Sequence, residues 1–360
     1  MSKAAQLDRD AVRIGDLVIG GGLPVVVVGG QDARWLRLRG DGGPPGGGAG
    51  TVTDVSADTA VDAAADTAVD TAVDTAVDTA VDTAAEGTVA EARARWAGPL
   101  LVEPASVADL PAVARHADGV VVGAAWAGDP ELVRAAARLG LPVVLQRGLV
   151  QRGRVATLEE WLAAVDACVA EGNEAVVLCE SGGRAEPEDA APDLGLMRAA
   201  RERTGRPVLA GLGGDGVLAH AAVAAGADGL LVGPGAPVRA LAAAHEAATV
   251  MAALVRPDSP ETLEAARAAI DRVDAALATL LERRAALAGR IQRLKPVGGF
   301  RGRDMERERR LVAAMARRAP SLGAGLLAPI MNAVIEAGLR LHAAQQENPS
   351  DPEGRAAGLD

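Results

Sequence analysis

Aromatic side chains are nearly absent from this 360-residue chain, which has no tyrosine, one phenylalanine and four tryptophans. Ala, Val and Leu must therefore fill its hydrophobic cores, and each of these buries less apolar area than an aromatic ring. We expect a protein of modest stability for its length, because folding removes less apolar area from water.

Cysteine is also scarce, with only Cys168 and Cys179. Two cysteines in a chain of this length indicate reduced thiols rather than a disulfide framework. The first residues lack the apolar core of a secretory signal, and no apolar run is expected to span a membrane. We therefore expect a cytoplasmic protein without a membrane partner.

Basic residues are outnumbered, and the formal net charge of −11 argues against a nucleic-acid partner. Part of the excess lies in a repeat, mostly Asp-Thr-Ala-Val, with an aspartate at every fourth position from Asp58 to Asp82. A four-residue period drifts against the helical turn, and each aspartate repels the next. The repeat predicts a disordered or marginally helical low-complexity insertion over residues 58–85. A calcium-binding repeat is the alternative, but the segment lacks the glycines with which calcium loops turn.

The most regular pattern lies near the C-terminus, where apolar residues recur mostly at spacings of three and four. They are Leu263, Ala266, Ile270, Val273, Leu277, Leu280, Leu281, Leu287 and Ile291. This spacing predicts one long amphipathic helix. Ser259 before Pro260 is the predicted start, and Pro296 before a Gly-Gly pair is the predicted end.

Helix geometry limits which cations on this helix can share a ligand. At about 1.5 Å of rise per residue, Arg267 and Lys295 lie roughly 42 Å apart. If both serve one site, Arg267 must come from a second copy of the chain. Arg284 and Lys295 lie on nearly the same face, about 16 Å apart, so their long side chains can converge on a small dianion.

The charged residues of this region resemble those of the all-helical (type II) chorismate mutases over residues 258–346. The matching positions are Arg267, Asp274, the Leu-Leu-x-x-Arg ending at Arg284, Lys295 and Asp304-x-x-Arg307-Glu308. The resemblance implies an all-α domain of three helices that forms an intertwined homodimer and converts chorismate to prephenate. This pericyclic reaction needs no cofactor or metal, only positioning of the substrate and donors for its negative charge.

The resemblance also implies a role for each residue. Arg284, the partner copy's Arg267 and, in support, Arg307 bind the carboxylates, and Lys295 donates to the ether oxygen. Glu308, with the backbone near Asp304, receives the substrate hydroxyl.

The last helix, predicted over about Leu326–Gln345, should carry a second donor to the ether oxygen. The aligned position holds His342, and Gln345 or Gln346 could serve instead if the register slips. A surface histidine without a catalytic role is the other interpretation. Pro329 falls early in this helix and removes a backbone donor. Residues 347–360 are predicted to be a disordered tail.

Residues 86–250 show short apolar runs that alternate with helical stretches. The runs are Leu100–Val102, Gly119–Val122, Pro142–Leu145, Ala175–Leu178, Pro207–Ala210 and Gly229–Val232; the helices are 106–116, 129–139, 157–171, 193–204 and 216–226. Residues 1–57 add a hairpin, strands at Val25–Val28 and Trp35–Arg39, and a Gly- and Pro-rich loop. Eight strands in this α/β pattern favour a (β/α)8 TIM-type barrel over a doubly wound sheet.

This barrel resembles DAHP synthase of type I beta over about residues 11–245. The resemblance rests on Ile19-Gly-Gly-Gly-Leu-Pro, Gln146-Arg147-Gly148, Ala156-Thr157-Leu-Glu-Glu-Trp161, Glu171-Gly-Asn-Glu174 and Ala224-Ala-Gly-Ala-Asp228. That family condenses two phosphorylated substrates at a divalent metal. At its four metal-ligand positions this chain has Gln31, Gly214, Gly233 and Ala243, which cannot rebuild the ligand set.

The phosphate-binding residues of that family are also reduced. Gln146 and Ala125 stand where the family has a lysine and an arginine. Arg147 and Arg184 remain, either as an anion site at the mouth of the barrel or in local ion pairs. We therefore predict no metal site and no DAHP synthase activity.

The sequence favours a chorismate mutase fused to a degenerate barrel. The alternative is a non-catalytic protein that regulates or scaffolds another aromatic-pathway enzyme, which the intact spacing from Arg267 to Glu308 disfavours. A third interpretation, with both activities retained, conflicts with the missing metal ligands.

Overall fold

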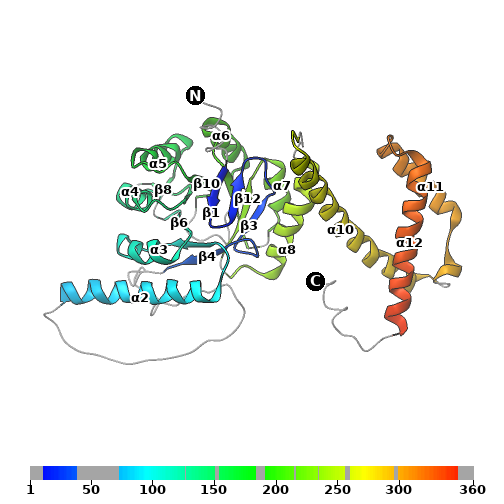
Figure 1. The fold of residues 1–360 in the computed structure, drawn as a ribbon, viewed down its shortest axis with the longest axis horizontal. Helices are drawn as coiled ribbons and strands as arrows, with labels where there is room; N and C mark the ends of the chain where they lie inside the picture. Colours follow the sequence, from blue (N-terminus) through cyan, green and yellow to red (C-terminus); the bar gives the residue numbers. More distant parts are fainter. Residues whose placement is uncertain are drawn as a thin grey trace. The chain divides into compact units, whose positions relative to one another are not determined.

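The computed structural model divides the chain into two compact units, Met1–Ala266 and Arg267–Asp360. It describes residues 11–38, 73–125, 127–150, 154–183, 191–214, 216–233, 235–255, 260–295 and 299–347. Figure 1 shows a strand-and-helix unit followed by a unit made of helices alone. Each unit is described here by itself.

The first unit contains an eight-stranded parallel sheet with the order β3-β12-β11-β10-β7-β6-β5-β4. Its strands are β3 (Val26–Val28), β4 (Arg34–Arg37), β5 (Leu100–Glu103), β6 (Gly119–Val122), β7 (Val143–Gln146), β10 (Val176–Glu180), β11 (Val208–Leu212) and β12 (Gly229–Val232). These Val- and Leu-rich runs form strands because both faces are covered, one by helices and one by the barrel interior. The eight predicted strands are confirmed.

The sheet closes between β3 and β4 through a single parallel bridge, Val28 to Ala33. We followed the paired positions from strand to strand once around the sheet, starting at Trp35. The circuit returns to the chain at Val27, so the register shifts by 35 − 27 = 8 residues. A shear of eight is that of (β/α)8 barrels. The predicted fold class is therefore confirmed, with a weakly closed seam.

In the part of the chain that the structure describes, seven helices follow the strands, and the crossover between β3 and β4 has none. They are α2 (Val73–Arg95), α3 (Leu110–His116, after the short η1, Val107–Asp109), α4 (Pro130–Arg138), α5 (Leu158–Ala170), α6 (Leu194–Thr204), α7 (Ala219–Ala224) and α8 (Val238–Glu246). η4 (Ala247–Met251) and α9 (Ala252–Val255) continue α8, and β8 (Leu149–Val150) pairs with β9 (Arg154–Val155) before α5.

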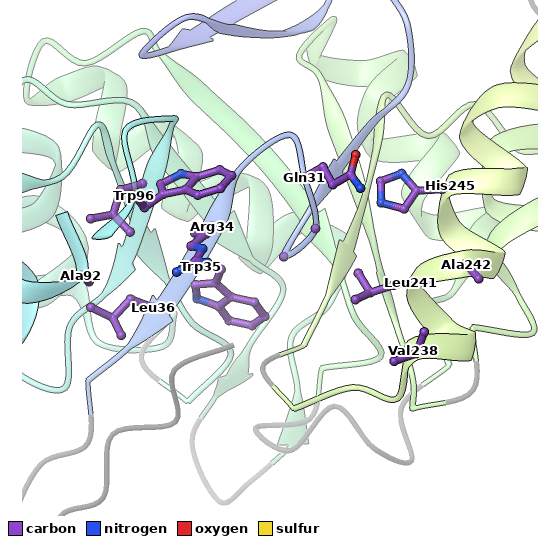
Figure 2. Close-up of a pocket in the computed structure, with 13 residues that line it drawn as sticks. Gln31, Arg34, Trp35, Leu36, Ala92, Trp96, Val238, Leu241, Ala242 and His245 are labelled. Atoms are coloured by element: carbon purple, nitrogen blue, oxygen red, sulfur yellow. The ribbon is translucent and has the colours of Figure 1, made fainter. Parts of the chain in front are cut away.

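Five residues, Gly29 to Ala33, join β3 directly to β4, although parallel strands usually need a crossover of a dozen or more. The turn depends on Gly29, whose φ is 87°; a Cβ there would lie 2.2 Å from the Val232 carbonyl oxygen. The Asp32 carboxylate accepts a hydrogen bond from the Val27 N–H at 2.7 Å and so caps the edge of β3. Among the described residues, no crossover helix therefore covers the outside of this seam. A cavity of about 460 Å³ lies there instead (Figure 2).

A hairpin of β1 (Ala11–Ile14) and β2 (Leu17–Gly20) closes the N-terminal end of the barrel. Ile14 and Ile19 are fully buried among the side chains that fill the barrel interior. Ile14 lies close to Gly119, the first residue of β6. The predicted hairpin is thus confirmed, and its function is to cover one end of the core.

Helix α2 includes the last part of the acidic repeat, which favours the marginally helical alternative for residues 73–85. The rest of the repeat lies outside the described residues. Ala85 and Val89 are buried against the barrel. Arg93 anchors the helix end, because it pairs with Asp118 and donates to the His116 carbonyl. Tertiary packing of its last turns holds the helix in place.

The second unit contains most of α10 (Leu263–Leu294), from Arg267 onward, with η5 (Phe300–Gly302), α11 (Met305–Arg318) and α12 (Gly323–Glu347). The three predicted helices are confirmed. Helix α10 begins three residues later than Pro260, because the Thr262 hydroxyl accepts a hydrogen bond from the Ala265 N–H at 3.1 Å and caps it. Ser259, the predicted cap, lies outside the described residues.

Two helical stretches are long and apolar enough to cross a membrane, Val238–Val255 and Gly323–Gln346, with mean hydropathies of 1.4 and 1.3. This finding corrects the expectation that no run is long enough. The first contains α8, which packs on β12 and α7, and the second is α12. Length and composition alone are weak evidence for a membrane span, since core helices have the same properties.

Candidate active site

The predicted cations of α10 lie on its apolar face. At about 100° per residue, Arg284 and Lys295 fall within the arc of the apolar residues that start at Ile270. Those apolar side chains stay exposed in one copy: Ile270, Val273, Leu277, Leu280, Leu281, Leu287 and Ile291. The helix is unbroken from Leu263 to Leu294, so the separation of Arg267 from Lys295 expected from the sequence holds. Cationic residues and an uncovered apolar surface therefore share one face.

Lys295 is held at the end of α10 by the loop that follows. Its Nζ donates to the Gly302 carbonyl at 2.7 Å. The Gly299 N–H donates to Gln292 Oε1 at 2.8 Å, which folds this loop back onto the helix.

Lys295 is half-buried. The pKa of Asp304 is lowered mainly by the Arg307 N–H and that of Glu308 mainly by Arg303, and the charge of Lys295 adds a smaller lowering to both. The structure thus brings Lys295, Asp304 and Glu308 into one electrostatic neighbourhood.

Asp304 is the N-cap of α11. Its Oδ1 accepts from the Arg307 N–H at 2.9 Å, and that hydrogen bond is the main reason that its pKa is lowered. The Arg307 side chain is exposed. Asp304 therefore fixes the start of the helix that carries Arg307 and Glu308.

Glu308 is bound by a residue to which the sequence assigned no role. Arg303 forks onto its carboxylate, with Nε–Oε1 at 3.0 Å and Nη2–Oε2 at 2.6 Å, which lowers the pKa of Glu308. Arg303 also donates to Asn332 Oδ1 at 2.7 Å, and Asn332 donates to Glu336 at 2.9 Å. The loop, α11 and α12 are joined through this network, which we call the Arg303 network.

Helices α10 and α12 cross at Gly338, where a Cβ would meet the Ala288 Cβ at 3.7 Å. Arg284 is one turn before Ala288, and His342 is one turn after Gly338, so both lie within a turn of the crossing. The His342 Nε2 lies 3.2 Å from Gln346 Nε2. The two alternative donors predicted on α12 are thus side by side.

The C-terminal mouth of the barrel holds ion pairs. Arg147 is buried and forks onto Glu180, whose Oε1 lies 2.8 Å from Arg147 Nη2. Glu180 is fully buried and also accepts from the Gly182 and Asp193 N–H groups. Of the two interpretations of Arg147, the local ion pair agrees with this geometry. Arg184 lies outside the described residues.

A second pair lies across the strand ends, where Arg37 Nε donates to Glu103 Oε2 at 2.8 Å. Buried Gln146 accepts from the Ala124 N–H at 2.9 Å. A Cβ on Gly123 would clash with Glu103, so this glycine makes the space that the carboxylate occupies. Among the described residues, these charged and amide side chains at the mouth therefore pair within the protein.

None of the four positions matched to metal ligands carries a His, Cys, Asp or Glu side chain. Gln31 lies in the exposed β3–β4 turn, Gly214 and Gly233 follow β11 and β12, and Ala243 lies within α8. Among the described residues, no three His, Cys, Asp or Glu side chains gather in a metal-binding cluster. His220 lies 3.8 Å from Glu246, and His245 faces the seam between β3 and β4.

Both parts of the chain are similar to known families. Residues 266–343 match chorismate mutase type II, and residues 84–210 match the DAHP synthetase I family. A phospho-2-dehydro-3-deoxyheptonate aldolase of Thermotoga maritima is 31% identical over 133 residues, which are 34% of this chain and 38% of that protein. The chain thus matches well under half the length of this relative. The resemblances to both families are confirmed.

Two solved structures from Thermotoga maritima align with 62% of this chain, each with a TM-score of 0.42. One is a truncated 3-deoxy-D-arabino-heptulosonate 7-phosphate synthase, 22% identical and 79% covered. The other is a phospho-2-dehydro-3-deoxyheptonate aldolase (DAHP synthase), 21% identical and 62% covered.

Proposed function

We propose that the helical unit converts chorismate to prephenate as a homodimer. The chain joins a region that matches the DAHP synthetase I family to one that matches chorismate mutase type II. One observation carries the proposal: Arg284 and Lys295 lie within the exposed apolar face of α10. A second copy that covers this face would bring its own α10 to the same place. It could then supply Arg267, which is too far away in the same copy.

The residues serve a reaction that needs positioning and charge. Arg284 and the partner copy's Arg267 would grip the two carboxylates, because guanidinium forks match carboxylate oxygens. Lys295 would stabilise negative charge that grows on the ether oxygen, and His342 or Gln346 would donate to the same atom. Arg307 would add positive charge. Glu308 would accept the substrate hydroxyl with the lone pairs that Arg303 leaves.

We also propose that the barrel has lost DAHP synthase activity. Two observations support this: Arg147 and Glu180 neutralise each other, and Arg37 and Glu103 do the same. Retained activity is the competing proposal, favoured by the family match over residues 84–210. Condensation of phosphoenolpyruvate with erythrose 4-phosphate, assayed with Mn²⁺, separates the two, and turnover would refute the loss.

The protein is proposed to be cytoplasmic, because its substrate is a water-soluble dianion and its cysteines are free and buried. A regulatory or scaffolding role toward another aromatic-pathway enzyme is the second candidate function. It applies if purified protein does not consume chorismate.

Loss of chorismate, followed by its absorbance, tests the mutase. We expect Lys295→Ala to lower kcat/KM by about 10²-fold or more, since it removes a donor to developing charge. Arg293→Ala, an exposed cation two residues earlier, is the matched control and should retain activity. Wild-type protein that does not accelerate chorismate loss would refute the enzyme.

Mixing two inactive variants tests the shared site. Homodimers of Arg267→Ala or of Arg284→Ala lack one of the two carboxylate-binding arginines in both of their active sites. A mixed dimer has one site with both changes and one with neither. Random re-pairing should therefore restore about a quarter of wild-type activity. Failure of the mixture to regain activity, with mixed dimers demonstrated, would place both arginines in one copy.

A further inference from the structure

Arg303 ties the loop after α10 to both of the helices that follow. It lies between η5 and α11. Two of its guanidinium nitrogens hold the two oxygens of the Glu308 carboxylate, and Nη2 also donates to Asn332 Oδ1 at 2.7 Å. Its Nη1 lies 3.6 Å from Glu336 Oε1 on α12. A fork of this kind fixes the plane of a carboxylate, whereas a single contact would let it rotate.

The Arg303–Glu308 pair differs from the pairs formed along single helices of the same unit. Arg309 pairs with Glu306 within α11, and its side chain is 75% exposed. Exposed pairs of that kind contribute little to stability. Arg303 and Glu308, by contrast, have side chains that are only 18% and 17% exposed. The pair is shielded from solvent and joins separate segments of the chain, so its geometry is well defined.

The orientation of Glu308 matters because this carboxylate is proposed to accept the substrate hydroxyl. Each oxygen of an ionised carboxylate has about two acceptor positions, and the fork occupies one on each oxygen. The directions of the remaining positions are therefore set by Arg303. The other contacts of Arg303 go to Asn332 and Glu336 of α12, so it can influence the substrate through Glu308.

We propose that Arg303 is a positioning residue of the mutase site, which orients Glu308 so that a free lone pair faces the substrate hydroxyl. This role rests on the proposed mutase function. Arg303 also favours the ionised carboxylate, because its hydrogen bond is the largest cause of the lowered pKa of Glu308. Lys295 lowers that pKa further, whereas the neighbouring charge of Asp304 raises it. Glu336 of α12 is the acidic group on the other side of the fork.

Chorismate turnover of Arg303→Lys and Arg303→Met, measured against pH, tests this role. Lysine keeps the positive charge but cannot fork, so Arg303→Lys should lose about tenfold or more of kcat/KM at pH 7. Its fall in kcat/KM toward low pH should stay close to that of wild type. In Arg303→Met this fall should also move to higher pH, because Glu308 then protonates more easily. Arg309→Met removes an exposed arginine of the same helix and should keep both activity and profile.

A double variant shows whether Arg303 acts through Glu308. If it does, adding Arg303→Lys to Glu308→Ala should cause no further loss of kcat/KM. Circular dichroism at the assay temperature establishes that each variant is folded. Arg303→Lys retains an ion pair, so the role stays testable where Arg303→Met does not fold.

Two outcomes would overturn the role of Arg303: full kcat/KM in Arg303→Lys, or the same loss from Arg303→Lys with and without Glu308. An unchanged pH profile in a folded Arg303→Met variant would contradict its effect on the charge of Glu308. Wild-type protein without chorismate turnover would refute the mutase, and this role with it. An active wild type with equally active Arg303 variants would refute the role alone, so the two failures are distinguished.

Discussion

Arg303 sets the electrostatics of the helical unit. Its fork onto Glu308 and its bond to Asn332 connect the loop, α11 and α12. The same fork occupies both oxygens of the carboxylate that is proposed to receive the substrate hydroxyl. Arg303 therefore orients Glu308 and keeps it charged, because a bound guanidinium favours the ionised form.

Replacing Glu308 tests this pairing through pH. The pKa of Glu308 is lowered from its ordinary 4.5, mainly by the Arg303 hydrogen bond. Its stabilising effect is thus complete above the unfolded pKa and is lost as pH falls through the lower folded value. Glu308→Gln should destabilise the helical unit at pH 7 by about 1 kcal/mol or less, since the pair is near the surface.

This deficit should shrink below about pH 4, when the wild-type carboxyl protonates as well. Thermal unfolding followed by circular dichroism at both pH values measures it. Glu306→Gln, which removes an exposed partner of Arg309, is the control. A deficit that is the same at both pH values would contradict the ionic pairing.

The family resemblance named Lys295, Asp304 and Glu308, which interact electrostatically near the end of α10. It did not predict the Arg303 network, because Asn332 lies 29 residues away on another helix. The sequence does show Glu308 five residues after Arg303. However, Arg303 precedes α11, Glu308 lies within it, and a spacing of five does not place two residues on one face of a helix. Local spacing shows neighbours on one helix, whereas contacts between helices depend on how they cross.

At the scale of elements, α10 has an apolar face that stays exposed among the described residues. Leu277 at its centre is 51% exposed, and Ile270 is 60% exposed. A stripe of this length on one helix is typical of an interface. Helix packing and the active site are therefore proposed to depend on the same contact.

Leu277→Asp should disrupt the dimer and abolish chorismate turnover together, because a charge would be buried at the interface. Sedimentation and activity, measured over a range of protein concentrations, check both effects. Ala275→Asp places the same charge on the opposite, exposed face and should change neither. A monomeric Leu277→Asp variant with full activity would refute the two-copy site.

The strands of the barrel were predictable because each is a short, fully apolar run, and all eight were found within a few residues. The structural consequence of the five-residue β3–β4 link was not predictable from the sequence. Counting strands gives the barrel, but only the register shows that the ring closes through one bridge and that a cavity replaces a helix. Likewise, the repeat pattern alone could not predict where α2 starts. The helix is stabilised by packing of its last turns, which the repeat does not show.

At the scale of the whole molecule, the two units carry separate optical signals. All four tryptophans, Trp35, Trp96, Trp126 and Trp161, belong to the first unit, and there is no tyrosine. Tryptophan fluorescence therefore reports the barrel alone, whereas circular dichroism reports the helices of both units. This separation permits a direct test of whether the units unfold together.

We expect two urea transitions that do not coincide, since each unit has its own contacts. The transition seen only by circular dichroism should move to higher urea as protein concentration rises, because a dimer is stabilised by mass action. The fluorescence transition should not move. Leu277→Asp is the control: it should remove the concentration dependence and leave the barrel transition unchanged. A single transition shared by both probes would instead mean that the barrel and the helical unit stabilise each other, and the barrel would then be a structural support for the mutase.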